Sequence, residues 1–218
     1  NLKVMAEYQA PMAEKLRKSV GNVTYYIMHG KTFARAKVAH VKNAKTPKQL
    51  RHRATFTMLV QLARVLIETT RTGFPEKAKG RSSSNEFMRA NKNFVEVDEN
   101  YEATIDLEKL QVSGGKLPCF FEVTVTYNAD GRMLTFQQEA QSNSLLNSDP
   151  KDLLYASILE TKTNLSGIVS LRARGESGVT SIELPEIWTV ENCNVYLFAT
   201  SENGYLASPS QHVKITTA

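Results

Sequence analysis

Residues 121–127 read FEVTVTY, so apolar and polar side chains alternate at every position. A period of two residues is typical of a β-strand with one buried face. Residues 128–131, NADG, have the composition of a turn, and the alternation resumes at Leu134 and Phe136. Two such strands joined by a short turn predict an antiparallel hairpin.

Further strand patterns follow this hairpin, separated by turn-like stretches at intervals of about 8–12 residues. They occupy residues 153–159, 168–173, 179–184, 192–199 and 212–215. Because no helical period interrupts the series, the sequence favours an antiparallel β-sandwich. Gly114, Gly115 and Pro118 precede the series, so we expect a sandwich domain at residues 116–218 after an N-terminal region at 1–115.

The N-terminal region is expected to contain a second hairpin, at about residues 19–41. Residues 20–28, VGNVTYYIM, are rich in β-branched and aromatic side chains, and His29, Gly30 and Lys31 offer a turn. The alternating polar positions of this hairpin are mostly cationic. One face of it should therefore be apolar and the other positive.

A helix is predicted at about residues 46–72. Thr46 suits the N-cap, Pro47 the first helical position and Gln49 a capping box, and Gly73 is a suitable terminator. The region is completed by a polar loop at about 75–84, a short helix at 86–94 and a strand at 103–107. The expected fold is thus mainly β with one long α-helix, the N-terminal β-hairpin and helix being joined to a C-terminal sandwich.

The net charge of +5 hides two opposed halves of the chain. Residues 1–98 hold nineteen Lys and Arg against seven Asp and Glu, whereas residues 99–218 hold eight against fifteen. No Asp or Glu occurs between Glu14 and Glu68. Such asymmetry suggests either a polyanionic partner or head-to-tail contact between copies of the chain.

The basic segment supplies a candidate contact surface for an anion or a protein partner. Its members are Lys31, Arg35, Lys37, Lys42, Lys45, Lys48, Arg51 and Arg53. The free amides and the dipole of the predicted helix start favour an anion, and arginine adds planar donors suited to phosphate or carboxylate. Tyr25, Tyr26 and Phe33 would offer stacking faces on the neighbouring hairpin.

Motifs of the common enzyme classes are not found in the sequence. The four histidines share no metal-ligand spacing, and the glycines form neither a phosphate loop nor a dinucleotide fingerprint. Residues 172–178, RARGESG, lie between predicted strands, so they are interpreted as a hairpin turn rather than a nucleophile elbow. We therefore expect no catalytic residue, no cofactor and no metal site.

Cys119 and Cys193 are the only cysteines, and both lie in apolar, strand-like contexts. They are expected to be reduced and buried, which favours synthesis in the cytoplasm. No apolar run is long enough to span a membrane, and the first residues show no secretory signal. The chain begins at Asn1 rather than Met, so the sequence leaves open whether a leader was removed.

The closing strands resemble those of fibronectin type III and related immunoglobulin-like domains. The resemblance rests on Leu184-Pro185, residues 193–199 (CNVYLFA), 202–204 (ENG) and 208–210 (SPS). It implies an immunoglobulin-like antiparallel β-sandwich. Cys193 stands where those domains have a tyrosine, so their tyrosine-corner hydrogen bond is not expected here. Trp188 also lies later in the sequence than their core tryptophan.

A second resemblance covers most of the chain. Residues 20–23 (VGNV), 30–32 (GKT) and 41–49 (VKNAKTPKQ), with Arg53 and Phe56, look like the opening of a bacterial domain-of-unknown-function family common in gut anaerobes. Ala44 and Leu50 stand where that family usually has proline and glutamine, respectively. The resemblance implies the same architecture of basic hairpin, helix and sandwich, and it implies no activity.

These observations favour a non-catalytic structural or interaction protein that assembles with copies of itself or with other proteins, as in a phage virion or similar particle. A nucleic-acid-binding protein that uses the basic hairpin and helix start is the alternative. A surface carbohydrate-binding or adhesion module is the second alternative. It would use the clustered aromatic residues Tyr196, Phe198 and Tyr205, which suit burial equally well.

Overall fold

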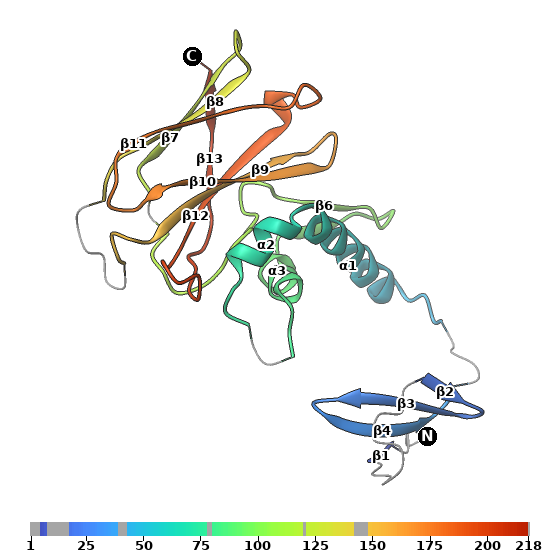
Figure 1. The fold of residues 1–218 in the computed structure, drawn as a ribbon. Coiled ribbons are helices and arrows are strands. Elements are labelled where there is room, and N and C mark those ends of the chain that lie inside the picture. The colour runs from blue at the N-terminus through green and yellow to red at the C-terminus, as the bar shows by residue number, and fades with distance from the viewer. Residues whose placement is uncertain are drawn as a thin grey trace. The chain divides into compact units, whose positions relative to one another are not determined.

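The computed structural model divides the 218-residue chain into two compact units, residues 1–46 and 47–218 (Figure 1). It describes residues 5–7, 18–38, 43–77, 80–119, 121–141 and 148–217. The first unit contains four strands, and the second contains the three α-helices and the remaining strands.

The first unit is an antiparallel sheet in the order β1-β4-β3-β2. Its strands are β1 (Met5–Glu7), β2 (Lys18–Val20), β3 (Val23–Met28) and β4 (Lys31–Ala36). His29 and Gly30 join β3 to β4, and both have positive φ, of 52° and 78°. Two positive φ values suit the tight hairpin turn that matches strand twist. The expected hairpin is present, and β1 and β2 widen it into a sheet.

The prediction of a single long helix is wrong, although the prediction of a mainly β fold is correct. The structure has three short helices, namely α1 (Pro47–Val65), α2 (Ile67–Gly73) and α3 (Ser83–Asn91). The break between α1 and α2 falls at the fully buried Leu66. There the Ser166 hydroxyl of the sandwich donates a 2.8 Å hydrogen bond to the Val65 carbonyl. A hydrogen bond from the sandwich therefore coincides with the break between α1 and α2.

Two four-stranded sheets make up most of the second unit, in the orders β10-β9-β12-β13 and β11-β8-β7-β14. Their strands are β7 (Val123–Asn128), β8 (Met133–Gln138), β9 (Leu153–Glu160), β10 (Leu165–Ala173), β11 (Gly178–Glu183), β12 (Cys193–Thr200), β13 (Gln211–Val213) and β14 (Ile215–Thr217). A short 3-10 turn, η1 (Val190–Asn192), precedes β12. The inner faces share one apolar core that includes Val125, Phe136, Ile158 and Leu197. The predicted hairpin of β7 and β8 is present in full register.

The helices pack on the outer face of the β10-β9-β12-β13 sheet. Leu59 and Ala63 of α1 and Phe87 of α3 share a second buried cluster with Tyr196 and Phe198 of β12. Residues 195–199 of β12 are therefore buried without a break, because both faces of that strand are covered. A two-stranded ribbon, β5 (Val95–Val97) and β6 (Ala103–Ile105), contributes to the same cluster.

The domain boundary expected at residues 115 and 116 lies inside the second unit. The Leu117 amide donates a 3.0 Å hydrogen bond to the Ala207 carbonyl. A Cβ atom on Gly115 would lie only 2.1 Å from that oxygen. The Gly-Gly step thus allows two backbones to approach closely, which explains its glycine composition without a linker.

Tyr196 ties the sandwich to the segment after β6 by a polar contact. Its hydroxyl donates a 2.9 Å hydrogen bond to the Leu107 carbonyl, and burial raises its pKa well above the usual range. We expect Tyr196→Phe to lower the free energy of unfolding by about 1 kcal/mol, because the carbonyl loses its partner. Urea denaturation measures this loss. The matched control is Tyr205→Phe, since Tyr205 is 74% exposed, and an equal loss there would contradict the prediction.

Candidate interaction surfaces

The sheet of the first unit has an apolar face. The register pairs Val23, Tyr25 and Ile27 of β3 with Ala36, Ala34 and Thr32 of β4. Because side chains alternate along a strand, these six residues share one face. The structure describes the burial of β2, β3 and β4, and every residue of these three strands is at least partly exposed. Val20 of β2 is 68% exposed. The apolar face therefore remains partly open to solvent.

The opposite face of the same sheet is aromatic and basic. Tyr26 and Phe33 stack with ring centroids 5.6 Å apart, and the Arg35 guanidinium lies 5.6 Å from the Tyr26 centroid. Lys31 pairs in register with Met28 and belongs to this face. The cation–π contact holds Arg35 against the ring while its polar edge stays exposed. This face thus combines two of the predicted site residues with a stacking pair.

The other predicted site residues fall in different places. Lys37 follows β4, and Lys45 precedes α1 with a positive φ of 44°. Lys48, Arg51 and Arg53 lie exposed in the first turns of α1, which belongs to the second unit. Lys42 lies outside the described residues. The basic segment is continuous in sequence, whereas its members are divided between the two units.

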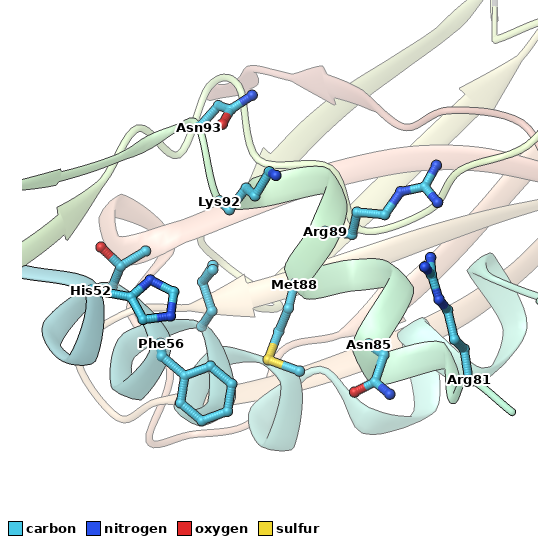
Figure 2. A pocket seen from close by; sticks show the side chains of 10 residues that line it. His52, Phe56, Arg81, Asn85, Met88, Arg89, Lys92 and Asn93 are labelled. Carbon is cyan, nitrogen blue, oxygen red and sulfur yellow. The ribbon is translucent and has the colours of Figure 1, made fainter. Parts of the chain in front are cut away.

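A groove lies between α1 and α3 in the second unit. Its volume is about 630 Å³. Figure 2 shows Phe56 and His52 on one side and Asn85 and Met88 on the other. Phe56 is 53% exposed, although Leu59, one turn further along α1, is buried. The groove therefore presents an apolar surface to solvent.

The rim of this groove is positively charged. Arg81, Arg89 and Lys92 line it, with His52 on the opposite side. Glu86 lies 3.3 Å from Arg81 and 3.6 Å from Arg89, and its side chain is mostly shielded from solvent. One carboxylate orders two guanidinium groups, so the three cations still exceed it by two charges. The arrangement favours an anionic ligand that also has an apolar part.

The sequence did not indicate this groove. Phe56 falls in the predicted helix at 46–72 and Arg81 in the predicted polar loop at 75–84, and neither prediction indicates a cavity. Ser82 caps α3 by accepting a 3.2 Å hydrogen bond from the Asn85 amide, so α3 starts three residues earlier than expected. The run of three serines at residues 82–84 is the sequence signal for this start, because serine is favoured at the N-cap of a helix.

The cysteines differ from the expectation of two buried thiols. Both are free, but Cys119 is exposed and Cys193 is half-buried. Burial, with the nearby carboxylates of Glu160 and Glu191, raises the pKa of Cys193 to about 11. Its thiol is therefore protonated at neutral pH and is a weak nucleophile.

The described ranges contain neither a candidate metal site nor a candidate membrane-spanning helix. No cluster of three or more histidine, cysteine or carboxylate side chains there has the arrangement of a metal site. No helix in the same ranges is long and apolar enough to cross a membrane.

The aromatic cluster that motivated a carbohydrate-binding module is mostly internal. Tyr196 and Phe198 are fully buried against the helices, and the Phe198 ring stacks on Tyr155 at 5.5 Å. Only Tyr205 of the three is exposed. A single exposed ring does not form the aromatic platform on which that alternative depends.

The chain matches one family model. No curated protein matches the chain. A model of a family of unknown function, DUF6266, matches residues 15–213, which include β3 and β4, all three helices and both sheets of the second unit except β14. Because this match spans most of the sequence, the chain belongs to the DUF6266 family of unknown function.

Proposed function

We propose that the protein is a non-catalytic assembly protein that associates with further copies of itself, as a repeated component of a larger particle such as a phage virion. The observation that carries the proposal is the N-terminal sheet, whose apolar face of Val23, Tyr25 and Ile27 is only partly covered. A sheet with one apolar face is stable when another layer covers that face. A second copy would supply this layer.

The distribution of charge supports the same proposal. Residues 1–46 hold nine Lys and Arg against two Asp and Glu, whereas residues 47–218 hold eighteen against twenty. The cationic unit of one copy and the second unit of another carry net charges of opposite sign, so they attract each other. Two cationic units carry the same sign, so they repel each other. A head-to-tail series is thereby favoured over a symmetric pairing of the cationic units.

Light scattering over a range of concentrations tests the proposal. The full chain is expected to form a multimer, and Tyr25→Ser with Ile27→Ser is expected to reduce it because the apolar face loses its contact area. The matched variant, Tyr26→Ser with Met28→Ser, changes the opposite face and should retain association. Circular dichroism verifies that both variants fold. A wild-type chain that stays monomeric at every concentration would overturn the proposal.

Nucleic-acid binding is the second candidate, and the aromatic, basic face of the N-terminal sheet favours it. Stacked rings beside cations are the elements with which proteins bind single strands. In this case a labelled oligonucleotide should bind with an affinity that falls steeply with salt. Lys31→Glu with Arg35→Glu should abolish binding, and binding that survives in that variant would exclude this face.

A further inference from the structure

We propose that the groove between α1 and α3 receives the loop that follows β11, residues 184–189, from a second copy of the chain. The inference rests on the proposed assembly function and names the two surfaces that meet. Both surfaces belong to the second unit, so the contact is separate from the apolar face of the N-terminal sheet. The groove and the loop have complementary chemistry.

The groove offers an apolar floor inside a cationic rim. Phe56 and Met88 line the cavity, and Arg81, Arg89 and Lys92 line it from α3 and the residues next to that helix (Figure 2). A wholly apolar ligand would leave the net positive charge of the rim uncompensated, because Glu86 is a single carboxylate among three cations. A simple anion would leave Phe56 in water. The best ligand is an aliphatic side chain flanked by carboxylates.

The loop after β11 has this composition. Ile187 is 65% exposed, and its neighbour Trp188 is buried in the core between the two sheets. Trp188 therefore anchors the loop while Ile187 projects from it. Glu183, Glu186 and Glu191 are exposed around it, and no ion pair is found for them within the described part of the chain. Their charge is available to a partner.

The loop is also held in a defined shape. The Arg132 guanidinium donates hydrogen bonds of 2.6 Å to the Pro185 carbonyl and 2.8 Å to the Trp188 carbonyl. The Trp188 amide donates a 2.9 Å bond to the Pro185 carbonyl and closes the turn. A preordered loop loses little conformational entropy on binding, which favours association through a small contact.

A second exposed loop of the sandwich fits the groove less well. Tyr205 is 74% exposed, and Glu202 is the carboxylate nearest to it in the sequence. Lys151 lies 3.8 Å from Glu202, so that charge already has a partner. This loop provides a matched control, because it too combines a carboxylate with an exposed apolar side chain.

The groove and the loop lie on different surfaces of the second unit. The groove belongs to the helical layer that packs on the outer face of the β10-β9-β12-β13 sheet. The loop is anchored through Trp188 in the core between the sheets. An interface between two different surfaces is heterologous, so repeated copies form a ring or an open chain.

Mixing two variants that are each defective in one surface tests the contact. Arg89→Glu with Lys92→Glu reverses charge in the groove, and Glu186→Lys with Ile187→Ser disables the loop. Each variant alone should lose the groove-dependent association. When both variants also carry Tyr25→Ser with Ile27→Ser, which disables the apolar face of the N-terminal sheet, a mixture should form a one-to-one dimer, because the intact loop of the first variant enters the intact groove of the second. Analytical ultracentrifugation at low salt measures both results.

Matched controls change charge by the same amount elsewhere. Lys116→Glu with Lys162→Glu alters two exposed lysines outside the groove, and Glu202→Lys with Tyr205→Ser alters the other loop. Both should associate as the wild type does. Equal effects from control and test pairs would overturn the assignment, as would a mixture that stays monomeric.

The failure of this inference differs from the failure of the proposed function. If the groove and loop variants associate normally while Tyr25→Ser with Ile27→Ser does not, assembly stands and the groove contact is excluded. A monomeric wild type overturns both. If the groove variant instead loses only binding to an oligonucleotide, the groove binds nucleic acid and the loop assignment is wrong.

Discussion

Replacing Arg174 by methionine is expected to lower the free energy of unfolding by about 3–5 kcal/mol. The guanidinium is 2% exposed, and its Nε donates a 3.3 Å bond to the equally buried Asp152 carboxylate. It also donates to the Gln141 side chain at 2.7 Å and to the Pro118 carbonyl at 3.0 Å. The variant would leave a buried carboxylate without its counterion, and the acceptors without this donor.

Urea denaturation of three variants separates this cause from a general loss of charge. Arg71→Met removes an exposed guanidinium that pairs with Glu68, and it should cost less than about 1 kcal/mol. Adding Asp152→Asn to Arg174→Met removes the stranded charge, so part of the lost stability should return. Similar losses for Arg71→Met and Arg174→Met would contradict the role of burial.

This buried network also shows what the sequence could not reveal. Residues 172–178 are predicted as a hairpin turn, and that prediction is wrong, because β10 and β11 belong to different sheets and residues 174–177 connect one sheet to the other. Nothing in the sequence near Arg174 identifies Asp152 as its partner, because the two meet only when β9 and β10 pair. A turn-like composition is a local signal, whereas the sheet that each flanking strand joins and the partner of a buried charge are set by tertiary packing.

Strand prediction succeeded where local pattern and burial agree. The alternation at residues 121–127 led to β7 because one face of that strand is more exposed than the other. In β12 the same rule would fail, since Tyr196 packs on the helices while Leu197 packs between the sheets. Its continuous apolar run at residues 195–199 still indicated a strand. The immunoglobulin-like resemblance of these strands stays a prediction.

The helix prediction failed for a tertiary reason. The start at Pro47 was correct because proline at the first helical position is a local signal. The break at Leu66 follows no glycine or proline, and it coincides with the Ser166 hydrogen bond to the Val65 carbonyl. The basic surface was predicted as one feature because the sequence does not show that a unit ends at Thr46.

The second large effect concerns two phenylalanines near the proposed groove. Phe87→Ala should lower the free energy of unfolding by about 3–5 kcal/mol, because Phe87 is fully buried and packs edge-on against Phe74 at 6.4 Å. Phe56→Ala should cost less than about 1 kcal/mol, since more than half of that side chain is already exposed. Urea denaturation measures both values.

The same two variants separate folding from association. Phe56→Ala should weaken association of folded chains about tenfold or more, because the groove loses the apolar floor that Ile187 would contact. Association is measured by ultracentrifugation under conditions where Phe56→Ala is shown to be folded. An exposed aromatic side chain adds little to folding, so a large effect on association with an unchanged stability assigns it to binding. If association is unchanged, Phe56 has no part in the contact, and the proposed fit of Ile187 in the groove is wrong.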